Sequence, residues 1–344
     1  MKLEELKMLQ CLPLEIKVGK TKLRIKEWIE YHGRDKVYIS FSGGKDSTVL
    51  AKLVTEVEFE MFGDNTIPLV FSDTGLEFPE LRQFAFKQNN IVVIRPAIPF
   101  PEVIKKYGYP VISKNTSANI YKLKNNNLSD RYRNYLLNGD ERGSYGTVPK
   151  KWQYLIDSDF NIGAGCCDVM KKRPLHKYEK ESGRNAPFTG EMAEESRLRQ
   201  KQYLEYGCNA FSRKKGFKST PLGFWTQNDI LEYIKINNIE IASVYGDIVI
   251  DSYKELPNGD KLPVYKTTGE NRTGCMFCMY GIQFEKDENR IQKLAKTHPK
   301  QYKYCTEGGT YNEDGQWVPC KGLGLGHVLD IMNIEWRVDS DKDM

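Results

Sequence analysis

The residues with the clearest chemical potential lie in one short segment, Ser42–Ser47, which reads Ser-Gly-Gly-Lys-Asp-Ser. Paired glycines let the backbone turn sharply and bring bare N–H groups toward an anion. A following helix N-terminus and the ammonium of Lys45 add positive charge, and Asp46 can hold magnesium. Because the Walker sequence is absent, we predict a phosphate loop of another type, with Lys45 as an exposed phosphate ligand. A simple turn and helix cap is the structural alternative.

Cysteines form the second group of candidate residues. Cys166 and Cys167 are adjacent, and Cys275 and Cys278 form a C-x2-C pair. Four thiolates from two distant segments suit tetrahedral zinc or an iron–sulfur cluster. A vicinal cysteine pair is an awkward half-site for zinc, and four free or paired thiols are the plain alternative. Cys305 and Cys320, with His298 and His327, could form a second metal site, although their spacing fits no motif that we identify; buried small side chains are the structural alternative.

The elements that must position the phosphate loop are visible in the hydrophobic pattern. We expect a helix over residues 14–32, buried strands over 37–41, 67–71 and 91–94, and helices starting near 47 and 79. Alternating strand and helix patterns return near residues 186–190 and 230–234. Strands that alternate with helices of this length predict an α/β fold, a parallel twisted sheet flanked by helices with right-handed crossovers.

Composition shifts suggest how the chain is organised. We expect an N-terminal helical segment over residues 1–35 and a nucleotide-binding domain over 36–285. Residues 114–160 within it are rich in Asn, Lys, Tyr, Arg and Gly and predict a surface insertion, a candidate lid. Residues 246–272 are expected to form a polar loop. Residues 286–344 predict a small, cysteine-containing C-terminal appendage.

The overall composition excludes several classes of protein. Of the 344 residues, 40% are hydrophobic and 12% aromatic, which is enough to bury a sizeable core and excludes disorder. The chain has no apolar run long enough for a membrane helix and no secretory signal, so we expect a cytoplasmic protein with no membrane partner. The net charge of +5 is compatible with a polyanionic substrate. Basic runs at 171–173 and within 197–215 fit a solvated face and a phosphate-binding surface equally well.

Four further segments, together with the phosphate loop, carry a resemblance to a known family. They are Phe71–Pro79, Cys166–Leu175, Gly190–Arg199 and Pro221–Asp229. They are similar to Asp-Thr-Gly-x-Glu-x-Pro, Cys-Cys-x-x-x-Lys-x-x-Pro-Leu, Gly-x-Arg-x-x-Glu-Ser-x-x-Arg and Pro-Leu-x-x-Trp-Thr-x-x-Asp. Over about residues 35–285 the chain resembles the phosphoadenosine phosphosulfate (PAPS) reductase family of the PP-loop adenine nucleotide alpha hydrolase superfamily. Met192 stands where that family usually has an arginine.

The resemblance implies a nucleotide site of the adenine nucleotide alpha hydrolase type. The residues implied for catalysis are Lys45, Asp46 and Lys171. Those implied for nucleotide binding are Ser42, Gly43, Gly44, Lys45, Asp46, Ser47, Asp73, Thr74, Gly75, Glu77, Gly190, Glu195, Ser196 and Arg199. Asp73 follows the second expected strand, where ligands of open α/β sheets bind. For Glu195 and Arg199, a helical i, i+4 salt bridge is the structural alternative.

The same resemblance bears on the cysteines. Assimilatory sulfonucleotide reductases that carry a 4Fe-4S cluster have a similar Cys-Cys and Cys-x2-Cys set. The resemblance therefore implies a 4Fe-4S cluster at Cys166, Cys167, Cys275 and Cys278, with Zn²⁺ as the alternative.

Three functions follow from the resemblance. The first is an ATP-consuming, magnesium-dependent enzyme with adenylation or pyrophosphatase chemistry, linked to sulfur transfer. The sequence also resembles the iron–sulfur ATPase component of DNA phosphorothioation systems, which implies a nucleic-acid or sulfur-donor partner, and a homodimer is considered. The second is a PAPS or APS reductase, whose loop generally lacks the lysine and whose tail reads Glu-Cys-Gly-Leu-His; here Pro319–His327 is only loosely similar. The third is a non-catalytic nucleotide-sensing iron–sulfur module.

Overall fold

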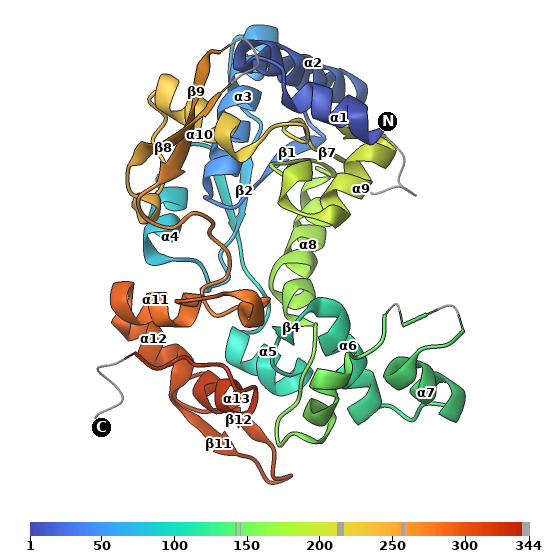
Figure 1. Ribbon diagram of the computed structural model, residues 1–344. Helices are drawn as coiled ribbons and strands as arrows, with labels where there is room; N and C mark the ends of the chain where they lie inside the picture. Colours follow the sequence, from blue (N-terminus) through green and yellow to red (C-terminus); the bar gives the residue numbers. More distant parts are fainter. Residues whose placement is uncertain (142, 145, 212–216, 256–258, 339–344) are drawn as a thin grey trace. The chain divides into compact units, whose positions relative to one another are not determined.

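The computed structural model describes residues 1–344 except 142, 145, 212–216, 256–258 and 339–344 (Figure 1). The chain divides into two compact units, each assembled from separate stretches. The first unit comprises Met1–Asp73, Glu77–Arg95 and Leu175–Thr273. The second comprises Thr74–Leu76, Pro96–Pro174 and Gly274–Met344. The domain boundaries near residues 35 and 285 stay a prediction.

The first unit is built on a mostly parallel sheet with strand order β3-β2-β1-β5-β7-β6. Its strands are β1 (Val37–Phe41), β2 (Leu69–Ser72), β3 (Ile91–Ile94), β5 (Ala186–Thr189), β6 (Asn209–Ala210) and β7 (Lys218–Ser219). Neighbouring strands pair in parallel from β3 to β7, and β6 pairs with β7 in antiparallel orientation. The predicted α/β class is confirmed. Because parallel strands end at the same edge, the residues after β1, β2, β3 and β5 lie at one edge of the sheet.

Helices flank this sheet. They are α1 (Leu3–Gln10), α2 (Leu14–His32), α3 (Lys45–Phe62), α4 (Pro79–Phe86), α8 (Arg173–Ser182), α9 (Arg197–Tyr206) and α10 (Gln227–Ile236). The helix α3 packs against both α2 and α10. The apolar face of α2 is buried through Ile25, Trp28 and Ile29, as the helical spacing over residues 14–32 predicts.

One sequence-based expectation for this unit is wrong. Residues 246–272, predicted as a polar loop, contain the antiparallel hairpin of β8 (Ile248–Glu255) and β9 (Lys261–Thr267). Residues Asp251–Glu255 of β8 are all exposed, so the strand carries no alternation of buried and exposed side chains. Without that alternation, the period-two pattern that identifies a strand is absent.

The second unit is formed largely by short helices. In its first half these are α5 (Phe100–Tyr107), α6 (Lys114–Asn125), α7 (Asp130–Asn138), the 3-10 helix η1 (Lys150–Asp157) and the π-helix η2 (Asp168–Lys172). Its second half contains α11 (Arg290–Thr297), α12 (Pro299–Thr306) and α13 (Leu325–Ile331), and its short strands are β4 (Val111–Ile112), β10 (Met279–Tyr280), β11 (Gly309–Tyr311) and β12 (Trp317–Pro319). The predicted insertion is therefore largely helical where it is described, and its role as a lid stays a prediction. Of the C-terminal cysteines, Cys305 is buried and Cys320 is exposed.

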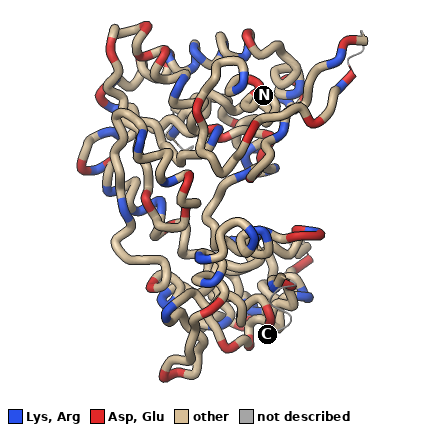
Figure 2. Tube along the Cα trace, turned by 90° about the vertical axis from the view of Figure 1, so that its left-hand side faces the viewer, with Lys and Arg blue, Asp and Glu red and all other residues tan. Residues whose placement is uncertain are grey.

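Charged residues of both signs are intermixed along the chain (Figure 2). This distribution agrees with the small net charge of +5. Of the second basic stretch, residues 213–215 lie outside the described residues. No helix in the described part of the chain is long and apolar enough to cross a membrane.

Candidate functional site

The phosphate loop connects the end of β1 to the first turn of α3. Gly43 has a φ of 73°, and a Cβ there would lie 2.7 Å from the Leu81 side chain, so only glycine fits this turn. The Ser42 and Ser47 hydroxyl oxygens lie 3.0 Å apart, and the Ser47 oxygen also accepts a hydrogen bond from the Ser42 N–H. A Cβ on Gly190 would lie 3.1 Å from the Ser47 nitrogen, so the residue after β5 also packs against the loop.

Lys45 is buried, which contradicts the prediction of an exposed phosphate ligand. Only 1% of its surface is accessible. Its Nζ donates to the carbonyl oxygen of Asn271 at 2.9 Å and lies 3.8 Å from Asp46 Oδ1. The physical reason is that residues Thr268–Thr273, which we call the return segment because they lead back from β9, cover the loop. Burial lowers the pKa of the Lys45 ammonium.

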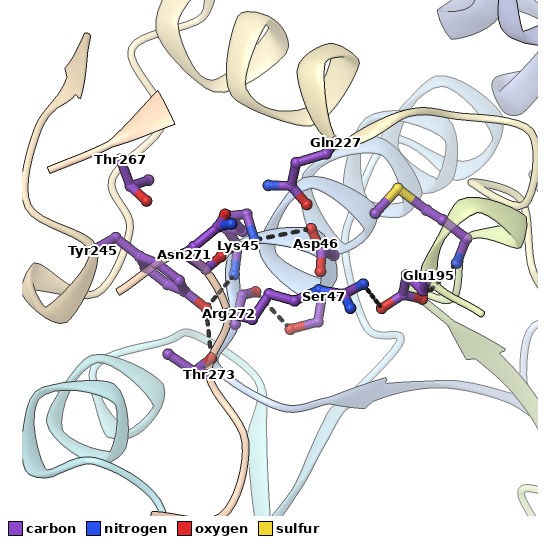
Figure 3. A network of polar contacts seen from close by, with 12 residues as sticks. Lys45, Asp46, Ser47, Glu195, Gln227, Tyr245, Thr267, Asn271, Arg272 and Thr273 are labelled. Atoms are coloured by element: carbon purple, nitrogen blue, oxygen red, sulfur yellow. Dashed lines mark hydrogen bonds and ion pairs between the residues drawn. The ribbon is translucent and has the colours of Figure 1, made fainter. Parts of the chain in front are cut away.

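Tyr245 contacts the same lysine. It lies just before β8, whereas the return segment follows β9. Its hydroxyl oxygen accepts a hydrogen bond from the Lys45 N–H at 3.2 Å and lies 2.6 Å from Thr273 Oγ1. The Lys45 ammonium lies 5.3 Å from the centre of the Tyr245 ring, within the range of a cation–π contact. Two donors that a phosphate loop offers to a phosphate, the backbone N–H and the ammonium of Lys45, are thus bonded to Tyr245 and Asn271 (Figure 3).

Asp46 and Gln227 each carry a buried polar atom without a hydrogen-bond partner among the described residues. Gln227 is the first residue of α10, and Figure 3 shows its side chain extending toward Asp46 and Lys45. Asp46 Oδ1 and Gln227 Nε2 are both buried, and neither has a hydrogen-bond partner among the described residues. Burial raises the pKa of the Asp46 carboxyl group, and the charges of Lys45 and Arg272 oppose this shift.

A group of charged side chains lies beside Asp46. Glu195 Oε1 is 3.2 Å from Arg272 Nη2, and the Glu195 carboxylate also pairs with Arg199. Glu195 Oε2 accepts a hydrogen bond from the Met192 N–H at 2.9 Å, which fixes the carboxylate. The i, i+4 salt bridge considered for Glu195 and Arg199 is therefore present, and Arg272 joins it. Ser196 caps α9 by accepting a hydrogen bond from the Arg199 N–H at 3.2 Å.

Asp73 lies at the same edge of the sheet, two strands from β5. Its carboxylate accepts hydrogen bonds from Arg82 at 2.7 and 3.0 Å and from Arg95 at 3.1 Å. These guanidinium groups hold the pKa of Asp73 below its ordinary value. Glu77 is also buried within the first unit. The other predicted site residues, Thr74, Gly75 and Lys171, belong to the second unit.

The four candidate metal-binding cysteines all belong to the second unit. The Cys166 thiol donates to the Cys167 sulfur at 3.9 Å, and Cys166 also interacts electrostatically with Cys275 and Cys278. The hydrogen bond from Cys166 and the charge of Lys114 lower the pKa of Cys167 to about 5, whereas burial raises that of Cys278. Among the described residues, no three or more His, Cys, Asp or Glu side chains are grouped so that they could hold a metal ion.

Four residues of the phosphate-loop site were not identified from the sequence. They are Gln227, Tyr245, Asn271 and Arg272. Arg272 lies three residues before Cys275, so its closeness to the C-x2-C pair was a usable signal. Tyr245 and Asn271 flank the misassigned hairpin, and neither has a distinctive spacing.

Comparisons with known proteins find a matching family model and a similar solved structure. A family model described as the phosphoadenosine phosphosulfate reductase domain matches residues 36–135 and 127–279. A similar solved structure is that of phosphoadenylyl-sulfate (PAPS) reductase from Candida auris in complex with phosphate. It has 15% sequence identity and a TM-score of 0.36, and the match covers 71% of this chain and 90% of that chain. No curated protein matches the sequence significantly.

Proposed function

The chain belongs to the phosphoadenosine phosphosulfate reductase family, and on this premise we propose that it binds ATP at the phosphate loop and cleaves it between the α and β phosphates. The observation that carries the proposal is the convergence of Lys45, Arg199 and Arg272 around the loop and Asp46. Three cations are a fitting complement to a triphosphate, whose charge exceeds that of a sulfonucleotide's phosphosulfate group.

The proposed chemistry assigns a role to each group at the loop. When a nucleophile attacks the α-phosphorus, negative charge grows on the departing pyrophosphate. Preorganised donors aimed at that charge lower the barrier. Lys45 can supply two such donors, its ammonium and its backbone N–H, once the ligand has displaced the Asn271 carbonyl from the ammonium and the Tyr245 hydroxyl from the N–H. Ser42 and Ser47 hold the loop closed through their paired hydroxyl groups.

The donor atoms present fit magnesium. Asp46 Oδ1 is a buried carboxylate oxygen without a hydrogen-bond partner in the described structure, and Mg²⁺ prefers such oxygen ligands together with substrate phosphates. When bound, Mg²⁺ would neutralise part of the triphosphate charge. In this proposal Asp46 holds the ion, and Asp73, Glu77 and Gly190, which belong to the same unit, contribute to the nucleotide site. The nucleotide-binding roles of Thr74 and Gly75 stay a prediction from the sequence.

For the second unit, we extend the proposal to a 4Fe-4S cluster at Cys166, Cys167, Cys275 and Cys278. Support comes from the chemistry of the donor set, four thiols that belong to one unit, with Cys166 hydrogen-bonded to Cys167 at 3.9 Å. Such a cluster supplies one-electron chemistry when bound. The charge of Lys171 also lowers the pKa of Cys167, and the predicted catalytic role of Lys171 in the nucleotide chemistry stays a proposal. Zn²⁺ is the alternative metal.

The experiment that tests the function is product analysis. Protein purified without oxygen is incubated with magnesium and ATP, or with PAPS and a thiol reductant. AMP or an adenylated acceptor together with pyrophosphate supports the proposal. A DNA or sulfur-donor acceptor is then tested by adding it to the ATP reaction, and sedimentation tests for the proposed homodimer. Nucleotide binding without turnover of either substrate would instead indicate a sensing module.

A sulfonucleotide reductase is the second candidate, favoured by the exposure of Cys320 just after β12. In that reaction a thiolate attacks the sulfur of the sulfonucleotide and releases the adenosine phosphate. The Cys320→Ser variant decides between the two. We expect it to leave pyrophosphate release nearly intact, whereas PAPS-dependent sulfite release that disappears in this variant would favour the reductase.

A further inference from the structure

Gln227 occupies a rigidly held position at the edge of the phosphate-loop site. It follows Thr226, the N-cap of α10, which exchanges two hydrogen bonds with Asp229 at 2.6 and 3.3 Å. The Gln227 N–H itself donates to Glu194 at 2.6 Å, so the backbone of the first turn is fixed on both sides. Asp229 is anchored further by an ion pair with the buried Lys17 at 2.6 Å. The side chain of Gln227 therefore projects from a fixed base.

The Gln227 side chain is partly exposed, but it extends toward the loop and its amide nitrogen is buried. Figure 3 shows it extending from α10 toward Asp46 and Lys45. Its Nε2 is buried, yet no described residue accepts a hydrogen bond from it. Buried donors in native proteins are nearly always paired, so an unpaired one is typically completed by a water molecule or a ligand. The partner of this amide must bring an acceptor atom into the space beside Asp46.

The neighbouring groups restrict what that partner can be. Asp46 Oδ1 accepts no hydrogen bond in the described structure, and its nearest cation, the Lys45 ammonium, is 3.8 Å away, so the oxygen has room for a closer cation. Gln227 Nε2 and Lys45 are donors and call for anionic or neutral oxygen atoms. Arg272, with its side chain 56% exposed, adds positive charge on the Glu195 side. A ligand that presents both a divalent cation and several oxygen acceptors meets all these requirements. Magnesium-bound pyrophosphate, alone or as the end of a nucleoside triphosphate, is such a ligand.

We propose that Gln227 is a further binding residue of the phosphate-loop site, and that its amide donates to an oxygen of the β or γ phosphate of a magnesium-bound nucleoside triphosphate. This inference rests on the proposed ATP site and deepens it. It assigns to the start of α10 the recognition of the part of ATP that adenylyl sulfates and AMP lack. Gln227 thus contributes to the selection of triphosphates over monophosphates.

The test compares the affinities for three ligands by isothermal titration calorimetry: magnesium-ATP, magnesium-pyrophosphate and AMP. The Gln227→Met variant removes the donor and keeps the side-chain length. Gln202→Met, on the exposed face of α9, is the matched control. For Gln227→Met we expect about tenfold weaker binding of ATP and pyrophosphate, because a hydrogen bond to a charged oxygen is lost, and unchanged binding of AMP. The control binds all three ligands as the wild type does.

A second variant keeps the inference testable if Gln227→Met folds poorly. Gln227→Glu preserves the shape and places a carboxylate against the phosphates, so ATP and pyrophosphate should bind more weakly than in the wild type, and the loss should shrink as added salt screens the repulsion. Wild-type affinity for ATP and pyrophosphate in both variants would show that water alone satisfies the amide and would overturn the inference. An equal loss for AMP would assign Gln227 a structural role. If the wild type binds neither ATP nor pyrophosphate, the proposed function fails first.

Discussion

Tyr245→Phe is expected to raise the affinity for ATP, although it removes hydrogen bonds from the site. The hydroxyl oxygen accepts from the Lys45 N–H at 3.2 Å and pairs with Thr273 at 2.6 Å. At about 0.5–1.5 kcal/mol for each hydrogen bond, the unliganded protein should lose about 1–3 kcal/mol of stability. A phosphate that binds the Lys45 N–H must displace the first of these bonds in the wild type. Without it, about 1 kcal/mol no longer opposes binding, which corresponds to about fivefold tighter binding.

Calorimetric titration with magnesium-ATP and thermal unfolding measure the two effects on the same protein. Tyr233→Phe is the control. Tyr233 is buried on α10 in the core of the first unit, where the centre of its ring lies 5.7 Å from that of Trp225. Weaker ATP binding by Tyr245→Phe would refute the reasoning, since it would mean that the hydroxyl group stabilises the bound state. Unchanged affinity together with lower stability would show that the Lys45 N–H does not exchange partners.

Three further outcomes are expected. Lys45→Ala should weaken ATP binding at least about tenfold and lower the free energy of unfolding by about 2–4 kcal/mol, because a buried side chain and a charged hydrogen bond are lost. An unfolding midpoint equal to that of the wild type would contradict the expected loss of stability. Lys45→Met is the control that keeps most of the side-chain volume. Protein purified without oxygen should be brown, with about four irons and four acid-labile sulfides per chain, whereas stoichiometric zinc and no visible absorbance would select the alternative metal. Asp73→Asn should lower the free energy of unfolding near neutral pH, because the ion pairs with Arg82 and Arg95 are lost. Since these pairs lower the pKa of Asp73 in the folded state, the loss of stability should be complete above pH 3.8 and should disappear as the pH falls through the lower pKa of the folded protein. A loss of stability that persists in denaturant titrations at low pH argues against the ion pairs as its cause.

The elements predicted correctly from the sequence are those whose pattern is local. β1 and β3 are short apolar runs, and α2 has a buried face at helical spacing, so the expected bounds 37–41, 91–94 and 14–32 agree with the structure. The β8–β9 hairpin was missed because so much of it is exposed that burial leaves no alternating signal. The helices of the predicted insertion begin instead at caps: Ser113 and Ser129 each accept a backbone hydrogen bond three residues on.

In the phosphate-loop site, too, the residues that are close together in the sequence could be predicted and the distant ones could not. The loop itself is contiguous, so its glycines, lysine and aspartate could be identified together. The groups that cover Lys45 could not be identified from the sequence, because Tyr245 is 200 residues and Asn271 is 226 residues away from Lys45 along the chain. One of the two contacts uses a backbone carbonyl, which every residue has, and therefore leaves no trace in the residue type. Only the path of the return segment brings it to the ammonium.

The hydrogen bonds that already satisfy Lys45 have a consequence for selectivity. An anion that enters this site exchanges bonds with a carbonyl and a phenol, so its affinity is the difference between two bonded states. A small ion such as chloride replaces few of these bonds and gains little from the exchange. A polyphosphate chain replaces them all at once and adds contacts of its own. The affinity of a ligand for the closed loop therefore depends on how many hydrogen bonds it can form at once, and negative charge alone is not sufficient for binding.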